Sequence, residues 1–259
     1  MTSATQSAPG GQDGPDRISE DTLLGGRVTL VQPLDGYRAA IDPVLLAAAV
    51  PAAPGDSILD LGSGAGAASL CLLARVSETR LTGLELQMDL VRLSGVNGRA
   101  NNLAARFIAM AGDVSRPPPR LAPGSFDHVM CNPPYHKATA ARPSANPGRD
   151  LANREGTAGL SAWLGAALAM TRSRGSITVI HRAERLDELL AGLSGRAGDI
   201  AVFPLWPGDG KEAKRVIVQA RNGSAAPLRV CPGLVLHEPN GAFTAEAQAI
   251  LRNAAPLVI

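Results

Sequence analysis

The stretch DSILDLGSGAGAASLCLLARV, Asp56–Val76, predicts a buried strand, a tight glycine turn and a helix. Its mostly apolar run, residues 58–61, has the length of a buried strand. Gly62, Gly64 and Gly66 follow directly. Glycine tolerates the positive φ angles of tight turns and lets the backbone approach a bound molecule closely, and a helix that starts there presents free N–H groups to it. The stretch is typical of the first unit of a ligand-binding α/β sheet.

Strands alternate with helices along the rest of the chain. Strands are expected in TRLTGLEL (79–86), ARFIAMAGDV (105–114), FDHVMCNPPY (126–135), GSITVIH (175–181), DIAVFPL (199–205) and KRVIVQAR (214–221), and helices in residues 87–103, 159–171 and 183–193. This alternation predicts a doubly wound, Rossmann-like α/β sheet with mostly parallel strands. Only WPGDGKEAK (206–214) joins the last two strands, so we expect an antiparallel strand at one edge.

The N-terminal residues divide into a tail and a cap segment. Residues 1–17, MTSATQSAPGGQDGPDR, are polar and rich in Gly, Pro and Ser, which predicts a disordered tail without the apolar core of a signal peptide. Residues 18–259 are expected to form one domain, in which 18–55 are an N-terminal cap segment and 56–259 the core with the C-terminal strands. Within the cap segment we expect a strand over 27–31 and a helix over 43–50 capped by Asp42.

Composition excludes several classes of protein. No stretch approaches the roughly 20 uninterrupted apolar residues of a membrane span. Cys71, Cys131 and Cys231 are far apart and form no CxxC pair, which argues against a disulfide framework and against a metal site. We therefore expect a cytoplasmic protein with no membrane partner. The formal net charge of +2 requires any nucleic-acid surface to be local.

Three carboxylates are predicted at the ends of consecutive strands, namely Asp60, Glu85 and Asp113. Open α/β sheets bind ligands at this edge. Glu85 can accept hydrogen bonds from both hydroxyls of a ribose, and Asp60 suits a cationic amine. Asp113 can accept a bond from the amine of adenine, or it is a simple turn residue. Together they match S-adenosylmethionine, although Gly62-Ser63-Gly64-Ala65-Gly66-Ala67 also passes a relaxed dinucleotide test that leaves a dehydrogenase open.

The strand at residues 126–131 ends in Asn132-Pro133-Pro134-Tyr135. Proline cannot continue a strand ladder, so the run also serves as plain strand punctuation. Its chemistry suits an amino nitrogen, whose lone pair is delocalised into a ring or carbonyl. The Asn132 side-chain oxygen and the Pro133 carbonyl can accept both N–H protons, and Tyr135 can stack on the planar acceptor. His136 can take the proton that the nitrogen releases, but we interpret it as a flanking surface residue with no catalytic role.

The motifs DLGSGAG, GLEL, GDV and NPPY, in this order between residues 57 and 135, resemble those of class I S-adenosylmethionine-dependent methyltransferases that act on planar amino nitrogens. More narrowly, LVQPLDGYRAAIDPVLLAAAV (30–50) and the closing residues 215–251 resemble the bacterial tRNA (adenine-N6)-methyltransferases of valine tRNA. This resemblance implies S-adenosylmethionine as cofactor and a role for Tyr37, Arg38 and Asp42 in closing its pocket. Packing of a cap helix on the sheet is their alternative role.

The resulting prediction is an S-adenosylmethionine-dependent N-methyltransferase whose leading acceptor is adenine-N6 in tRNA or another structured RNA. The alternatives are N-methylation of a protein glutamine amide or of guanine-N2 in rRNA, and, in a different class, a non-catalytic RNA-binding module. The chain offers two basic segments for RNA phosphates, and either can equally be a solvated loop. They are Lys211, Lys214 and Arg215 beside Trp206, and Arg142, Arg149 and Arg154 in the loop 136–157. Trp163 is expected in the core.

Overall fold

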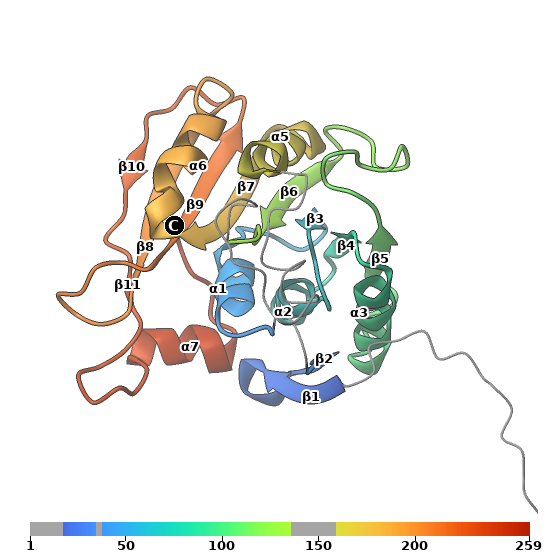
Figure 1. Ribbon diagram of the computed structural model, residues 1–259, viewed down its shortest axis with the longest axis horizontal. Helices are drawn as coiled ribbons and strands as arrows, with labels where there is room; N and C mark the ends of the chain where they lie inside the picture. Colours follow the sequence, from blue (N-terminus) through green and yellow to red (C-terminus); the bar gives the residue numbers. More distant parts are fainter. Residues whose placement is uncertain (1–17, 35–37, 136–158) are drawn as a thin grey trace, which may run out of the picture.

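The computed structural model describes residues 18–34, 38–135 and 159–259, and a mixed sheet forms the centre of this part of the chain (Figure 1). Its strands run in the order β10-β8-β9-β7-β6-β3-β4-β5, and β11 also pairs with β8. The strands are β3 (Ser57–Leu61), β4 (Arg80–Glu85), β5 (Phe107–Ala111), β6 (Phe126–Cys131), β7 (Thr171–Arg182), β8 (Ala197–Trp206), β9 (Arg215–Asn222), β10 (Arg229–Val230) and β11 (Leu234–Val235).

The predicted doubly wound, mostly parallel sheet is confirmed. Strands β5, β4, β3, β6 and β7 are parallel neighbours, and β9 is antiparallel to both β7 and β8. The antiparallel strand β9 lies between β7 and β8, and the edge beyond β8 is completed by β10 and β11. The sequence did not indicate these two short strands.

Two hydrophobic cores cover the two faces of the sheet. One face packs against α1 (Asp42–Ala49), α2 (Ala67–Arg75) and α7 (Ala245–Asn253), and the other against α5 (Leu160–Met170) and α6 (Leu186–Leu193), which follows the short turn η2 (Ala183–Arg185). Neighbouring residues of β3 serve different cores, Ile58 the first and Leu59 the second. This follows from the two-residue period of a strand. Asp60 shares the α2 face with Ile58, which places it against that helix.

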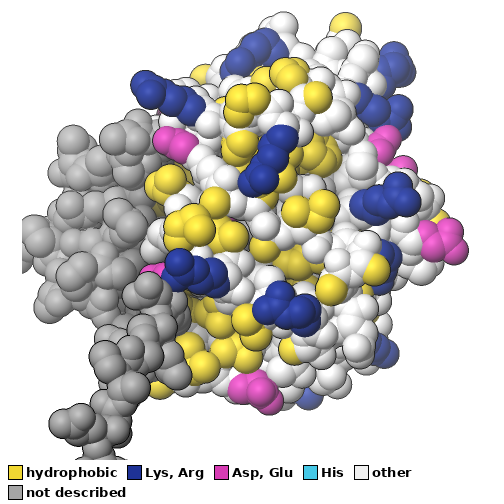
Figure 2. Space-filling view, turned by 90° about the vertical axis from the view of Figure 1, so that its right-hand side faces the viewer, with side chains coloured by type: hydrophobic (Ala, Val, Ile, Leu, Met, Phe, Trp, Pro, Cys, Tyr) yellow, Lys and Arg dark blue, Asp and Glu magenta, His cyan; other side chains and the backbone are white. Residues whose placement is uncertain are grey.

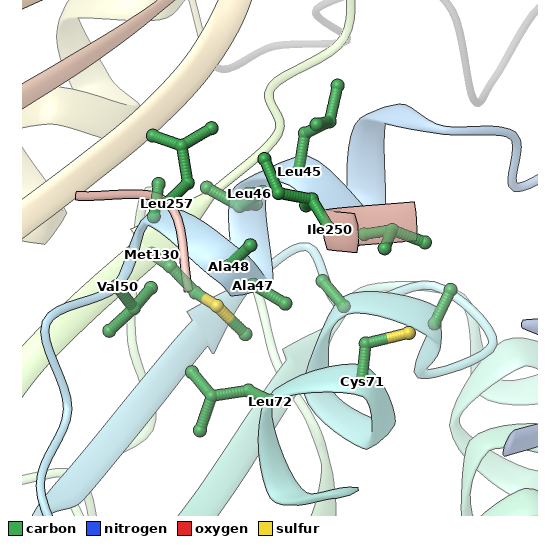
Figure 3. Packing of buried hydrophobic residues seen from close by; sticks show 14 of the residues in the cluster. Leu45, Leu46, Ala47, Ala48, Val50, Cys71, Leu72, Met130, Ile250 and Leu257 are labelled. Carbon is green, nitrogen blue, oxygen red and sulfur yellow. The ribbon is translucent and has the colours of Figure 1, made fainter. Parts of the chain in front are cut away.

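The cap helix α1 is buried along its whole length (Figure 3). It lies between α2 and α7, where its residues contact Cys71, Leu72, Met130, Ile250 and Leu257. The Leu257 N–H also donates to the Ala48 carbonyl at 2.9 Å. The predicted cap was wrong: Ile41 occupies the N-cap position, and the Asp42 side chain makes no capping bond. Its carboxylate instead accepts hydrogen bonds from Tyr135 and Arg215. The sequence did not predict α7, which Thr244 caps through a bond from Ala247 N–H.

An antiparallel hairpin precedes the cap helix and lies beside α3 (Met88–Ala100) at the bottom of Figure 1. It consists of β1 (Ile18–Leu23), the turn η1 (Leu24–Gly26) and β2 (Val28–Pro33). The strand expected over 27–31 is thus confirmed as β2, while β1 was not foreseen. Two asparagine side chains of α3 make the hydrogen bonds to β2 that a third strand would otherwise make. Asn97 bonds the N–H and the carbonyl of Val31, and Asn101 bonds the N–H and the carbonyl of Thr29, at 2.7–2.9 Å.

The tail expected over residues 1–17 lies outside the described residues. Among the helices that are described, none combines the length and the apolar character needed to span a membrane.

Candidate active site

The glycine turn lies between β3 and α2 and is fixed to the end of β4. The Gly62 and Ser63 N–H groups both donate to the Leu84 carbonyl, at 2.7 and 3.1 Å. Gly62 has φ +69°, and a Cβ there would overlap the indole ring of Trp163. Gly64 has φ +56°, and a Cβ there would meet no atom within 4 Å. The turn is therefore packed on one side and open at Gly64, as a ligand-binding backbone requires.

Glu85 is hydrogen-bonded to the backbone of this turn. Its Oε2 accepts a bond from Gly64 N–H at 3.0 Å, and its Oε1 accepts one from Gln87 N–H at 2.8 Å. Only 7% of Glu85 is exposed, and burial raises the pKa of its carboxyl. The structure thus joins the predicted residues Gly64 and Glu85 in one site.

Asp60 is buried on the α2 side of the turn, where its Oδ2 accepts a bond from the Ser69 hydroxyl at 2.7 Å. Burial, together with the negative charge of Glu85, raises the pKa of Asp60 to about 7. Among the described residues neither carboxylate has an ion pair. A positively charged ligand would lower the free-energy cost of burying each of the two negative charges, so the pair favours such a ligand.

Asp113 follows β5 on the same edge. Its Oδ1 accepts bonds from Ser115 N–H at 2.7 Å and from the Ser115 hydroxyl at 2.8 Å, so it is a turn residue in this structure. Gly112 N–H donates to the Glu85 carbonyl at 2.9 Å, which holds this turn beside the end of β4. Leu86, which we did not single out from the sequence, is 62% exposed there. An apolar residue directly after the strand-ending glutamate was the available signal.

The Asn132-Pro133-Pro134-Tyr135 run leaves the sheet next to the glycine turn. Cys131, the last residue of β6, pairs with Leu61 of β3 and with Val179 of β7. Asn132 and Gly62 therefore start the two neighbouring loops at the same edge of the sheet. The Oδ1 atom of Asn132 is buried. The run thus ends a central strand and lies beside the predicted cofactor residues.

Tyr135 is held by residues from two distant parts of the chain. Its hydroxyl donates to Asp42 Oδ2 at 2.5 Å, and Arg215 Nε donates to the same oxygen at 2.6 Å. Asp42 is 3% exposed. The ring lies edge-on to His181, with centroids 5.4 Å apart. Sequence reasoning missed His181, a polar residue at the end of the mostly apolar run GSITVIH, and it missed the pairing of Arg215 with Asp42.

His181 is fully buried on β7. Its Nδ1 accepts a bond from Arg182 N–H at 2.9 Å, so the neutral ring carries its proton on Nε2. Burial first, and then the charge of Arg185, lower the pKa of His181 to about 4, while the Pro134 carbonyl opposes this shift. The His181 side chain is therefore neutral and packs against the loop that carries Tyr135.

The remaining predicted residues are dispersed. Arg38 pairs at 2.8 Å with Asp21 of strand β1, and Tyr37 lies outside the described residues, so a role of these two at the cofactor pocket stays a prediction. His136, Arg142, Arg149 and Arg154 also lie outside the described residues. Lys211 and Lys214 are both exposed, and Lys214 lies 4.0 Å from Glu212. Trp163 is buried as predicted, against Gly62.

Comparison with known proteins places these features in a family. Residues 40–147 match the family model described as methyltransferase small domain. A tRNA1(Val) (adenine(37)-N6)-methyltransferase from Shewanella halifaxensis is 34% identical over 39% of this chain and 40% of its own length. The chain thus matches less than half of that relative. A protein of the same name from Actinobacillus pleuropneumoniae is 30% identical over 68% of this chain and 73% of its own length.

A solved structure shows the same fold. The crystal structure titled as a predicted O-methyltransferase from Agrobacterium tumefaciens superposes with a TM-score of 0.71 and 26% identity, over 84% of this chain and 99% of that one. Its title names oxygen as the acceptor atom, whereas the sequence relatives carry a name that specifies adenine-N6. The match over most of the Actinobacillus protein shows that this chain belongs to the methyltransferase family that includes the tRNA1(Val) (adenine(37)-N6)-methyltransferases.

Proposed function

We propose that this protein transfers a methyl group from S-adenosylmethionine to the N6 atom of an adenine in tRNA. The observation that carries the proposal is the joint position of two features at one sheet edge. One is the glycine turn with its two buried carboxylates, Asp60 and Glu85, and the other is the Asn132–Tyr135 run that starts from the neighbouring strand.

The cofactor side of the site fits S-adenosylmethionine, which supplies an electrophilic methyl group on a positively charged sulfur. Glu85 would accept bonds from ribose hydroxyls, and exposed Leu86 would contact the adenine ring. Asp113 would accept the adenine amine through its second oxygen. Burial raises the pKa of Asp60 and of Glu85, which means that the ionised form of each carboxyl is destabilised. The positive charge of the ligand would offset this destabilisation. The open space at Gly64 leaves room for close approach of the ligand to the backbone.

The acceptor side of the site suits an amino nitrogen. The Asn132 Oδ1 and the Pro133 carbonyl would accept the two N–H protons of the amine and direct its lone pair toward the methyl group. Tyr135 would stack on the base and set its distance. Positioning of this kind supplies much of the rate of such a transfer. A strong base is not required, because the nitrogen becomes acidic once it carries the methyl group.

The choice of tRNA rests on the sequence relatives, whose printed name specifies adenine 37 of a valine tRNA. A ring amine inside a stacked helix is inaccessible, so the target base must lie in a loop and swing out onto Tyr135. On the side of the molecule that carries α3 and β5, Lys and Arg side chains stand apart from one another (Figure 2). Among the described residues, Lys211 and Lys214 in the β8–β9 loop are candidates for phosphate contacts, while the other predicted candidates, Arg142, Arg149 and Arg154, lie outside the described residues. Such a substrate implies a cytoplasmic protein.

Transfer of labelled methyl groups tests this function. The purified protein is incubated with tritiated S-adenosylmethionine and total tRNA from a strain that lacks the protein, and the RNA is digested to nucleosides. We expect the label in N6-methyladenosine. Label in a methylated guanosine would show that guanine is the acceptor. Label in a glutamine of a protein extract, while tRNA stays unlabelled, would show that the acceptor is a protein amide. Binding of RNA without any transfer would favour the non-catalytic alternative.

A further inference from the structure

The Tyr135 hydroxyl is fixed by side chains that the proposed chemistry does not use. It donates to Asp42 Oδ2, on the first residue of α1, and Arg215 Nε, on the first residue of β9, donates to the same oxygen. Asp42 and Tyr135 are 93 residues apart in the sequence, and Asp42 and Arg215 are 173 apart.

The charge of Asp42 needs this arrangement. Asp42 is 3% exposed, and its Oδ1 has no hydrogen bond within the described parts of the chain. Its carboxylate is therefore balanced through Oδ2 alone, by one cation and one phenol. A buried carboxylate without such partners is costly. The Tyr135 hydroxyl consequently has a strong, charge-assisted acceptor that limits the positions its ring can adopt.

A second contact limits the ring from its side. His181 lies edge-on to it at an interplanar angle of 74°. The side chain of His181 is itself fixed, because it is fully buried and its Nδ1 accepts the Arg182 N–H. The Tyr135 ring is thus oriented by α1, β7 and β9 together, before any acceptor binds.

We propose that Asp42 and Arg215 are positioning residues that hold the ring of Tyr135 in the orientation needed to stack on the acceptor base. This inference rests on the proposed function for the identity of the acceptor, but the geometry of the ring does not depend on it. It gives Arg215 a role other than the RNA phosphate contact that its place beside Lys211 and Lys214 suggested. It also ties the N-terminal cap segment to the acceptor side of the site.

Three variants and a control test the network by turnover. Tyr135→Phe removes only the hydroxyl, Arg215→Lys keeps a positive charge beside Asp42 but loses the Nε donor, and the third variant combines both. Arg221→Ala is the control, since Arg221 lies on the same strand and pairs with Asp199 at 3.2 Å instead. We expect each single variant to lower kcat about tenfold at saturating tRNA, with KM for tRNA and the affinity for S-adenosylhomocysteine within about twofold of wild type.

The double variant decides between roles. If Arg215 acts through the Tyr135 hydroxyl, the combined loss in kcat should equal that of the worse single variant. Losses that multiply to about a hundredfold, or an Arg215→Lys effect confined to KM for tRNA, would overturn the proposal.

A spectroscopic measurement separates this inference from the proposed function. The sequence contains two tyrosines, Tyr37 and Tyr135, so fluorotyrosine labelling gives two fluorine resonances, and Tyr135→Phe assigns them. We expect Arg215→Lys and Asp42→Asn to shift and broaden the Tyr135 resonance, and Arg221→Ala to leave it unchanged. An unchanged Tyr135 resonance in both variants would overturn the network even if tRNA methylation is confirmed. A shifted resonance in a protein that fails to methylate tRNA would uphold the network and reject the substrate.

Discussion

At the scale of single residues, the site is defined by two buried carboxylates and their few partners. Asp60 has the Ser69 hydroxyl, and Glu85 has the N–H groups of Gly64 and Gln87. These donors are neutral, so they only partly offset the cost of burial, and the pKa of each carboxyl is raised. Residues that stabilise the ligand-free protein poorly are thus well suited to a cationic ligand.

The pH dependence of stability should report Asp60. A pKa raised to about 7 means that this carboxyl contributes stability below its ordinary pKa, and that the contribution is lost as pH rises to about 7. The loss is at most about 1.4 kcal/mol per pH unit. Asp60→Asn removes this titration, so the stability of the variant relative to wild type should increase between pH 4.5 and 8. Urea unfolding at several pH values measures it, and a constant difference would show that Asp60 does not titrate as stated.

Glu85→Ala should weaken binding of S-adenosylmethionine by about 1.5–3 kcal/mol, because charge-assisted bonds to the ribose are lost. Isothermal titration calorimetry measures this loss, and NAD serves as the negative control ligand for the wild type and for the variant. Glu85→Gln is the matched variant, since an amide oxygen can still accept the Gly64 N–H. Unchanged affinity in Glu85→Ala would mean that the carboxylate does not hold the ribose.

At the scale of secondary-structure elements, the sequence predicts those parts whose order follows from local periodicity. The sequence predicted the strand, glycine turn and helix at Asp56–Val76, the parallel sheet and the antiparallel pair β8–β9. Strand β1 was not, because its ISEDTL sequence is polar and it pairs only within a surface hairpin. The contact between Asp42 and Arg215 joins residues 173 positions apart, and no local pattern encodes it.

The hairpin depends on an asparagine of α3, which gives a test at this scale. Asn97 is fully buried and bonds Val31 N–H and the carbonyls of Val31 and Ala65, the last of these in the glycine turn. Asn97→Ala should lower the free energy of unfolding by about 2–4 kcal/mol, since buried backbone groups lose their partners. Chemical denaturation measures it. Asn101→Ala, at a less buried position, is the comparison and should cost less; equal effects would contradict the bridging role of Asn97.

At the scale of the whole molecule, a net charge of +2 leaves little general attraction for RNA. Stacking of one base on Tyr135 is worth roughly 1–3 kcal/mol, which is too little to select one RNA. Selection therefore requires further contacts away from the acceptor site. Arg215 is engaged by Asp42 at 2.6 Å, so within the β8–β9 loop the two lysines are left for this task.

Replacing Lys211 and Lys214 together by Ala should weaken tRNA binding and reduce the slope of log affinity against log salt by roughly 1.5–2, for two lost phosphate contacts. Filter binding at several salt concentrations measures the slope. Glu212→Ala in the same loop should have the opposite effect on affinity. An unchanged slope in the double variant would remove this loop from the docking surface.

The central claim is that the Asn132–Tyr135 run carries the transfer step beside a separate cofactor site. Single-turnover methylation of tRNA by Asn132→Ala, with S-adenosylhomocysteine binding measured on the same protein, tests it most directly. Because the proposed role of Asn132 is to bind the amino nitrogen and not the cofactor, we expect S-adenosylhomocysteine binding within about twofold of wild type and a barrier raised by about 2–4 kcal/mol. A wild-type rate of transfer in this variant would contradict the account.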